Sequence, residues 1–485
     1  MTTTPILPGF YPDPSVCRVG DAYFLATSTF EYVPGVPIHR STDLVTWDLV
    51  GHALPDADVI RAPRGMAGAS AGIFAPTLRH HDGLFWVATT SIGRLGEGQL
   101  ITHAEGPAGP WSEPVFVPGT PGIDPDLAWL DDGTCLLTWR GFGPPGIHQV
   151  AIDPRTGARV GEETLLWEGT GLADTEGPHL IRRGDWWYLM VAEGGTHTGH
   201  GVSIARSRDP RGPFEPHPHN PIFSHRSTDH PVQAVGHPDL VELADGSWAM
   251  VHLGIRQQGS FPRFHVLGRE TFLQGVDWVD GWPAVIEGRF EAPARDRSWT
   301  DRFTDPTLDP RWLAPSVSPA SFARAGAGLV LETGRDPDGS EQDRALCARI
   351  VDLDWDASAE VAYGDACLSV RLDATHWYGV ELVDGVARAR AVSAPFDQVF
   401  GAEGVRPGDA LAIRARRIEP ALGESAGPDA IALGIERGEA FIELASLDGR
   451  YLSTELAGGF TGRMLGLEAL GGEARVGRVS YLPRV

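Results

Sequence analysis

Four side chains suited to acid–base chemistry stand at equivalent points of a repeated pattern. A proline, a small or polar residue and an aliphatic residue begin five segments of the chain. The positions just before these prolines hold Asp13, Ala75, Asp124, Glu176 (one residue earlier, beside a glycine) and His237. Carboxylates that crowd together raise each other's pKa, a cost that a purely structural role would avoid. We therefore interpret the acids and the histidine as parts of one functional site.

Carboxyl groups gathered without a phosphate-binding loop or a CxxC pair favour glycoside hydrolysis. That reaction needs one protonated carboxyl group, which protonates the leaving oxygen. It also needs one carboxylate, which activates water or attacks the anomeric carbon. A third carboxylate can orient the acid and tune its pKa, and aromatic side chains, including some of the 15 tryptophans, can stack on sugar rings. The alternative is a sugar-binding protein without catalysis, which would have no use for an acid of raised pKa.

The segments that carry these residues are predicted to be short β-strands. Glycine (60 residues) and proline (39) interrupt the whole chain, and the apolar runs between them are short. Each proline motif is followed by a turn and then by an apolar strand. The turns are Gly20-Asp21, Asp82-Gly83, Asp132-Gly133, Gly184-Asp185 and Asp245-Gly246.

The motifs recur every ~50–60 residues, a length typical of the blades of a β-propeller. The sequence thus predicts an all-β fold that begins with a five-bladed β-propeller over residues 1–295. Equivalent positions of the blades would meet at one mouth of the central channel. A β-sandwich with chance matches to the proline motif is the alternative.

The pattern changes near residues 289–300. Beyond this point the strands alternate polar and apolar residues, and Asp384-Gly385 between WYGVELV and VARARAV is a strong signal for a two-residue hairpin. The sequence predicts a second domain over residues 300–485, an antiparallel, jelly-roll-like β-sandwich that closes or supports the active site.

Composition restricts partners and location. The net charge of −24 argues against nucleic acid and anionic membranes as partners. The apolar runs fall short of the ~18 residues of a membrane helix, and the segment MTTTPILPGFYPDPS lacks the features of a secretory signal. Four scattered cysteines do not make a disulfide framework. We expect a cytoplasmic protein. The sequence leaves open whether it forms a homo-oligomer.

Several segments resemble glycoside hydrolase family 43, in particular its two-domain β-xylosidase and α-L-arabinofuranosidase group. They are PILPGFYPDPSV, GIFAPTLRHHDG, IDPDLAWLDDG, TEGPHL, VAEGGT and LGRETF. The resemblance implies a five-bladed propeller and an inverting mechanism. By the same resemblance Asp13 is the general base and Glu176 is the general acid, while Asp124 raises the pKa of Glu176 and fixes its orientation.

Other residues match the family with less specific motifs. Arg269 resembles the arginine that holds the innermost sugar. Phe30 and Phe74 resemble aromatic walls of the pocket, although many members carry tryptophan at the position of Phe74. Phe460 resembles a residue of the second domain that closes the active site. His237 matches an axial histidine that binds a cation or a water chain in some members, so the sequence leaves open whether a calcium ion binds beside it. We expect no cofactor to be required, and we identify no metal ligands.

The sequence therefore predicts an inverting exo-glycosidase that releases xylose from the non-reducing end of short β-1,4-xylooligosaccharides. An α-L-arabinofuranosidase, or an enzyme with both activities, is the alternative, because α-L-arabinofuranosides resemble β-xylopyranosides in space. The expected partner is a xylooligosaccharide or an arabinoside. His197 and His200 are expected on a polar loop.

Overall fold

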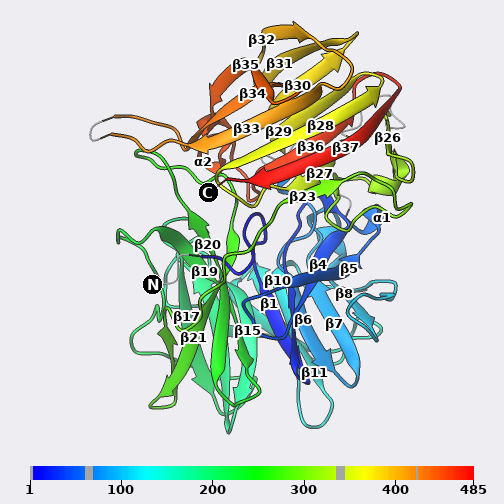
Figure 1. Cartoon of the computed structure of the whole chain (residues 1–485). Coiled ribbons are helices and arrows are strands. Elements are labelled where there is room, and N and C mark those ends of the chain that lie inside the picture. The colour runs from blue at the N-terminus through cyan, green and yellow to red at the C-terminus, as the bar shows by residue number, and fades with distance from the viewer. Residues whose placement is uncertain (1–3, 61–68, 335–343, 422–423, 485) are drawn as a thin grey trace.

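The computed structural model describes residues 4–60, 69–334, 344–421 and 424–484. Strands make up nearly all of its regular structure, which agrees with the all-β prediction (Figure 1). The α-helices α1 (Ala57–Ile60) and α2 (Thr454–Ala457) have four residues each, and the 3-10 helices are η2 (Ile92–Glu97), η3 (Pro319–Ser321) and η4 (Gly449–Leu452). In the described ranges, helices of the length and apolarity needed to cross a membrane do not occur.

Five antiparallel sheets follow one another along the first part of the chain. The first contains β1 (Ser15–Val19), β2 (Ala22–Ala26), β4 (Gly35–Ser41) and β5 (Asp48–Leu54), and the second contains β6 (Thr77–His81), β7 (Leu84–Thr89), β8 (Gln99–Ala104) and β9 (Val115–Val117). The third contains β10 (Gly122–Trp129), β11 (Cys135–Phe142), β12 (Pro145–Asp153), β13 (Ala158–Arg159) and β14 (Thr164–Trp167). The fourth contains β15 (Glu176–Arg183), β16 (Trp186–Glu193), β17 (Gly201–Ser207) and β18 (Glu215–Pro216), and the fifth contains β19 (Val232–Glu242), β20 (Trp248–Arg256), β21 (Glu270–Val279) and β22 (Trp282–Ile286).

The turns predicted from the sequence connect the first two strands of every sheet. In the first sheet Val19 pairs with Ala22 across Gly20-Asp21, and in the fourth sheet Arg183 pairs with Trp186 across Gly184-Asp185. The proline motifs therefore mark the first strand of each sheet.

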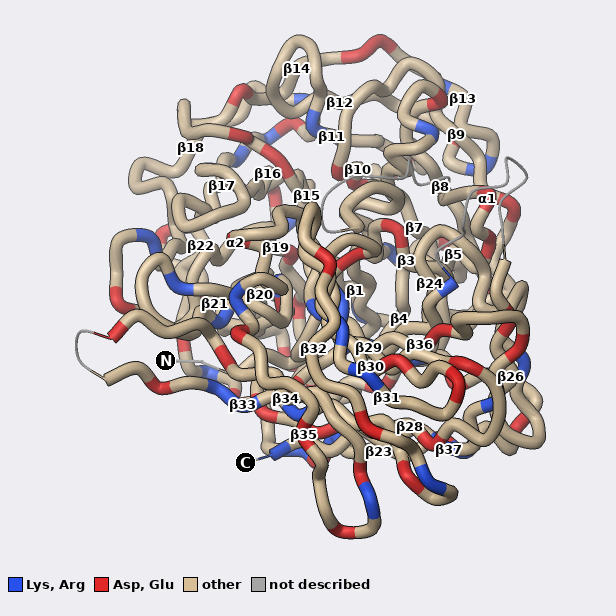
Figure 2. The backbone as a smooth tube through the Cα atoms, turned by 90° about the horizontal axis from the view of Figure 1, so that it is seen from above, with Lys and Arg blue, Asp and Glu red and all other residues tan. Residues whose placement is uncertain are grey.

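These first strands contact one another in a closed series. β1 contacts β6, β6 contacts β10, β10 contacts β15, β15 contacts β19, and β19 contacts β1. Seen from above, β1, β10, β15 and β19 lie near the centre of the molecule, whereas later strands such as β14 and β18 lie at its edge (Figure 2). Apolar side chains fill the spaces between neighbouring sheets, as where Phe24 packs edge-on against Phe85 with ring centroids 4.8 Å apart.

A buried polar layer fills the centre of this series. It consists of the residues directly after the five motif prolines, which meet around the guanidinium of Arg79. These residues are Ser15, Thr77, Asp126, His179 and Asp239. Arg79 donates to Asp126 Oδ1 and to Asp239 Oδ2, each at 2.7 Å. This layer lies two or three residues further along the strands than the candidate acids, so it forms a floor beneath them.

The last part of the chain forms two antiparallel sheets, and residues 287–298 before it carry neither helix nor strand. One sheet contains β23 (Trp299–Asp301), β25 (Ala323–Arg324), β26 (Leu329–Glu332), β28 (Trp355–Tyr363), β33 (Ala410–Arg417), β34 (Asp429–Arg437), β35 (Ala440–Asp448) and β37 (Glu473–Pro483). The other contains β27 (Leu346–Arg349), β29 (Ala366–Asp373), β30 (His376–Val383), β31 (Val386–Ser393), β32 (Phe396–Gly404) and β36 (Met464–Ala469).

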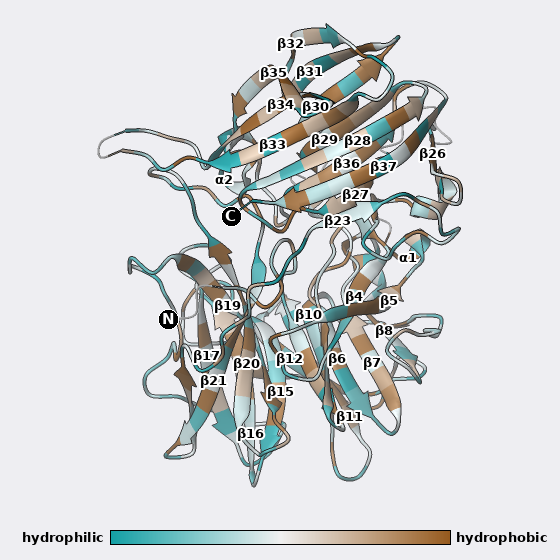
Figure 3. Cartoon of the chain, in the orientation of Figure 1, coloured by the Kyte–Doolittle hydropathy of each residue, from teal (hydrophilic) through white to brown (hydrophobic). Residues whose placement is uncertain are grey.

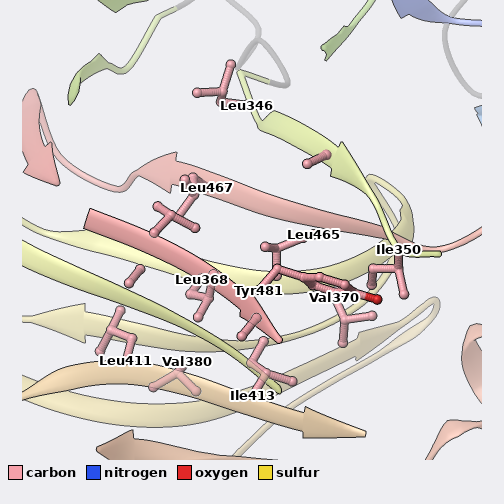
Figure 4. Close-up of a cluster of buried hydrophobic side chains, with 14 of the residues drawn as sticks. Leu346, Ile350, Leu368, Val370, Val380, Leu411, Ile413, Leu465, Leu467 and Tyr481 are labelled. Carbon is pink, nitrogen blue, oxygen red and sulfur yellow. The ribbon is translucent and has the colours of Figure 1, made fainter. Parts of the chain in front are cut away.

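These two sheets share one hydrophobic core. Leu368 and Val370 of one sheet and Leu411 and Ile413 of the other belong to the same buried cluster (Figure 4). Apolar residues alternate with polar ones along the strands, as the hydropathy colouring shows (Figure 3). The hairpin predicted at Asp384-Gly385 is confirmed, because Val383 pairs with Val386 across it.

The two parts of the chain are joined by a strand pair and by a shared apolar cluster. β3 (Tyr32–Val33) pairs with β24 (Ala314–Pro315). Phe10 and Phe30 from the first part pack with Leu313, Cys347 and Met464 from the second. All four cysteines are buried thiols that form no disulfide bond.

Candidate active site

A pocket of about 280 Å³ opens where the first strands of the five sheets, called the inner strands below, face the last part of the chain. It is lined by Asp13, Phe30, Phe74, Ala75, Ile123, Asp124, Arg140, Asp174, Glu176, Thr196, His237, Arg269 and Phe460. The structure thus brings together all eight residues that the sequence singled out. They come from all five inner strands or the segments just before them, from loops, and from the second part of the chain.

A shared backbone irregularity accompanies these positions. The pairing register shifts at the corresponding point of β10, β15 and β19. Asp13, Asp124 and His237 have positive φ angles of 56°, 59° and 49°, and Gly177 has one of 57° at the equivalent point. A β-carbon on Gly177 would lie 2.9 Å from His237 Nε2, so only glycine fits there. Positive φ is costly for other residue types and is held by the surrounding structure, as often happens at functional sites.

Asp13 is surrounded by groups that stabilise its charged form. Burial alone would raise the pKa of Asp13, but the Arg269 guanidinium at 3.1 Å and the Ser28 hydroxyl, which donates at 2.5 Å, outweigh burial and lower it. A buried carboxylate that stays ionised is a candidate general base.

The surroundings of Glu176 have the opposite effect, because they favour its protonated form. Burial raises the pKa of Glu176 to about 7, against the lowering influence of Arg140, and the negative charge of Asp13 adds to the rise. Arg140 Nη1 donates to Glu176 Oε2 at 2.7 Å. A carboxyl group that is partly protonated near neutral pH is a candidate general acid.

The pKa of Asp124 is raised as well. Burial and then the charge of Glu176 raise the pKa of Asp124 well above its usual value, while the backbone N–H of Gly177 donates to Asp124 Oδ2 at 3.0 Å and lowers it. The like charges of Asp124 and Glu176 thus oppose ionisation of both groups, whereas the pKa of the neighbouring Asp13 is lowered.

Three phenylalanines form the apolar wall of the pocket. The ring centroid of Phe30 lies 5.2 Å from that of Phe74 and 5.7 Å from that of Phe460, which comes from the second part of the chain. Arg269 lies with its guanidinium carbon 5.2 Å from the centroid of the Phe460 ring and also donates to Thr196 Oγ1 at 3.0 Å. Aromatic faces beside fixed polar groups suit a sugar ring, which has both apolar and hydroxyl-bearing sides.

His237 lies behind Asp13, and its Nδ1 is 3.6 Å from Asp13 Oδ1. Burial lowers the pKa of His237 to about 4, so its ring is neutral at pH 7. His197 and His200 lie on the loop between β16 and β17, as expected, and His197 is exposed. His200 differs because it is only 1% exposed: its ring packs beside Gly236, and its Nδ1 lies 3.2 Å from the Ala234 carbonyl oxygen.

The surroundings of His237 do not fit a calcium ion. Calcium takes six to eight oxygen ligands, and the carboxylates near His237 are already paired with arginines. Asp13 is paired with Arg269, while Asp126 and Asp239 are paired with Arg79. The positive charge beside these carboxylates is thus supplied by side chains of the protein.

Sequence analysis missed three polar pocket residues, Arg140, Asp174 and Thr196, as well as the apolar Ile123. Arg140 bridges Glu176 and Asp174, donating to each at 2.7 Å. Strand pairing could have indicated it, since Arg140 stands opposite Ile123, the neighbour of Asp124. Asp174 and Thr196 lie in loops, where no periodic pattern points to them.

Comparisons with known proteins agree with this arrangement. Residues 2–283 match the family described as glycosyl hydrolases family 43, and residues 300–480 match the β-xylosidase C-terminal concanavalin A-like domain. A non-reducing end α-L-arabinofuranosidase from Bacteroides ovatus is 46% identical over 286 residues, which cover 58% of this chain and 53% of that protein. A xylan 1,3-β-xylosidase from Vibrio sp is 38% identical over 381 residues, which cover 67% of this chain and 69% of that protein. The alignments thus span from about half to about two thirds of these relatives.

Solved structures match over nearly the whole chain. A structure described as "Bacteroides ovatus Xyloglucan PUL GH43B" is 34% identical with a TM-score of 0.86, covering 99% of this chain and 98% of that one. A xylan β-1,4-xylosidase from Bacillus halodurans is 26% identical with a TM-score of 0.86, covering 99% of this chain and 100% of that one. With its first 283 residues matching the family and its pocket carrying the acids, the chain belongs to glycosyl hydrolases family 43, a family of glycoside hydrolases.

Proposed function

We propose that this protein is an inverting exo-glycosidase that removes xylose from the non-reducing end of short β-1,4-xylooligosaccharides. The observation that carries the proposal is the opposed ionisation of Asp13 and Glu176 within one pocket. We also interpret the five sheets as the blades of a five-bladed β-propeller and the last two sheets as a β-sandwich. The closed series of inner strands supports the propeller.

In the proposed reaction Glu176 gives its proton to the glycosidic oxygen as the bond to the anomeric carbon breaks. Asp13 takes a proton from the water that attacks this carbon from the opposite face. The products are xylose of inverted configuration and a shortened oligosaccharide. Afterwards Asp13 holds the proton and Glu176 is ionised, so one proton must return through solvent before the next turnover.

The pocket favours a single terminal sugar. Its volume of about 280 Å³ lies at the low end for small-molecule sites, and Phe460 from the second part of the chain completes its phenylalanine wall. Phe30 and Phe74 supply apolar faces for the ring, and Arg269 supplies donors for its hydroxyl groups. These features support exo-action on short chains.

An α-L-arabinofuranosidase is the second candidate. Relatives of this chain carry both names, since an α-L-arabinofuranosidase and β-xylosidases both match it. The same base and acid would serve an α-L-arabinofuranoside, because the two substrates present a similar anomeric geometry.

The test compares 4-nitrophenyl β-D-xylopyranoside with 4-nitrophenyl α-L-arabinofuranoside and follows by proton NMR which xylose anomer the xyloside releases first. We expect a larger kcat/KM for the xyloside and α-xylose as its first sugar product. Asp13→Asn serves as the control for contaminating enzymes and should be inactive on both substrates. A larger kcat/KM for the arabinoside would replace the proposed substrate, and β-xylose as the first product would make Asp13 a nucleophile. Sugar binding without turnover of either substrate would indicate a non-catalytic protein.

A further inference from the structure

Two histidines and a glutamate converge beside the fifth sheet, outside the active-site pocket. His225 and His230 lie in the loop before β19, and Glu287 directly follows β22. One ligand atom from each residue lies within 4.8 Å of the others. The histidine side chains are 7% and 6% exposed, and that of Glu287 is 33% exposed. The cluster is therefore a mostly buried pair of imidazoles that reaches solvent through one carboxylate.

The backbone at Val232 orients both imidazole rings. The Val232 carbonyl oxygen lies 2.8 Å from His225 Nδ1 and 3.0 Å from His230 Nδ1, so it can accept a hydrogen bond from each ring. In that tautomer both Nε2 atoms present lone pairs, as metal-binding histidines do when a carbonyl holds the other nitrogen.

His230 also has a second tautomer. In it Nδ1 accepts from the Val232 N–H at 3.1 Å, and Nε2 carries the proton. This Nε2 is buried, and the described part of the chain gives it no hydrogen-bond partner. The nearest carboxylate oxygen, on Glu287, lies 3.7 Å away. In both tautomers His230 Nε2 therefore lacks a hydrogen-bond partner among the described residues. A buried polar atom without a partner indicates a bound ligand.

The distances from the carboxylate to the two imidazole nitrogens suit a tetrahedral ion. Glu287 Oε2 lies 3.3 Å from His225 Nε2 and 3.7 Å from His230 Nε2. Ligands at the usual ~2.0–2.2 Å from zinc stand roughly 3.3–3.5 Å apart in a tetrahedron. Imidazole nitrogens with one carboxylate are the donor set of zinc and related ions, whereas calcium and magnesium prefer oxygen.

We propose that His225, His230 and Glu287 bind a divalent transition-metal ion, with Zn²⁺ as the best match, and that water completes its coordination. The ion would connect the loop before β19 to the segment after β22. It would therefore act as a clamp at the edge of the fifth sheet, independent of the reaction in the pocket.

The test uses the full chain without a histidine tag, because a tag would bind the same ions. The protein is stripped with a chelator, and Zn²⁺ is titrated calorimetrically into the wild type, His230→Gln and Glu287→Gln. Co²⁺ is then added as a probe, since tetrahedral Co²⁺ absorbs strongly in the visible range and its spectrum depends on its ligands. His219→Gln is the matched control, an exposed histidine in the same loop.

We expect one ion per chain in the wild type and in His219→Gln, with a Tm that rises on Zn²⁺ addition. We expect binding at least tenfold weaker in His230→Gln and Glu287→Gln, with loss of the Co²⁺ spectrum. Glu287 is partly exposed, so its substitution should leave the fold intact even if that of His230 does not. Absence of binding in the wild type, or unchanged affinity and spectrum in Glu287→Gln, would overturn the proposal.

Discussion

At the scale of single residues, burial and neighbouring charges make the pKa values of three neighbouring acids differ. Arg269 and Ser28 hold Asp13 ionised, whereas burial and like charge raise the pKa of Asp124 and Glu176. Arg140 opposes this rise at Glu176 through its 2.7 Å contact. The balance places Glu176 near neutrality, where a group can both give and regain a proton.

Substitution of Arg140 should move the alkaline limb of the pH profile. Without the Arg140 cation the charged form of Glu176 loses stabilisation, so its pKa should rise above about 7. An acid with a higher pKa stays protonated to higher pH. The alkaline limb of kcat/KM for Arg140→Met should therefore shift upward by about one pH unit or more.

Arg140→Lys is the control for this prediction, because it keeps the positive charge. Its alkaline limb should stay close to that of the wild type. An unchanged limb in Arg140→Met, with only a lower rate, would show that Arg140 positions groups without setting the pKa of Glu176.

At the scale of elements, the segment after α2 extends the second part of the chain to the pocket. The backbone N–H of Phe460 donates to Ser70 Oγ at 2.6 Å, and that of Arg463 donates to the Val266 carbonyl at 3.0 Å. The guanidinium of Arg463 is buried and paired with Asp429. The segment is thus fixed at both ends, and its phenylalanine is held over the pocket.

Phe460→Ala should weaken the binding of short substrates. The variant removes one apolar wall and admits water, but it leaves Asp13 and Glu176 in place. We expect a KM for xylobiose several-fold above that of the wild type with a nearly unchanged kcat. Steady-state kinetics with circular dichroism as the check of folding measure this.

Leu456→Ala is the matched control, since Leu456 lies in α2, directly before this segment, and is 52% exposed. Its kinetics should match the wild type. Wild-type kinetics in Phe460→Ala as well would mean that this side chain does not contribute to substrate binding.

At the scale of the whole molecule, the two parts of the chain are one packed unit. Arg349 from β27 donates through Nε to the Phe10 carbonyl at 2.7 Å, and its guanidinium lies 4.4 Å from the Tyr11 ring centroid. These residues directly precede the loop that carries Asp13. The second part of the chain therefore holds the segment that leads to Asp13, in addition to lining the pocket with Phe460.

A chain that ends after residue 299 should fail to fold into a soluble monomer. It would lose Leu313, Cys347 and Met464, which cover Phe10 and Phe30. Exposed apolar patches of this kind promote aggregation. Size-exclusion chromatography beside the full chain should show aggregate or insoluble protein, and a soluble monomer with wild-type kcat/KM would contradict this view of the interface.

The sequence by itself determined the inner strands and their turns. A proline motif, a Gly/Asp turn and an apolar strand are encoded within a short segment, so each first hairpin could be predicted locally, as could the Asp384-Gly385 hairpin. Repetition then indicated that Asp13, Asp124, Glu176 and His237 would meet.

Only the tertiary structure decided the burial of these residues and the charges that surround them. The pKa of Glu176 is a sum of burial and of charges that come from distant segments, including Arg140 and Arg269. The inward turn of His200 and the meeting of His225 and His230 with Glu287 depend on how loops pack against sheets. Sequence pattern carries strand periodicity, but it does not carry the distances between segments that set burial and electrostatic balance.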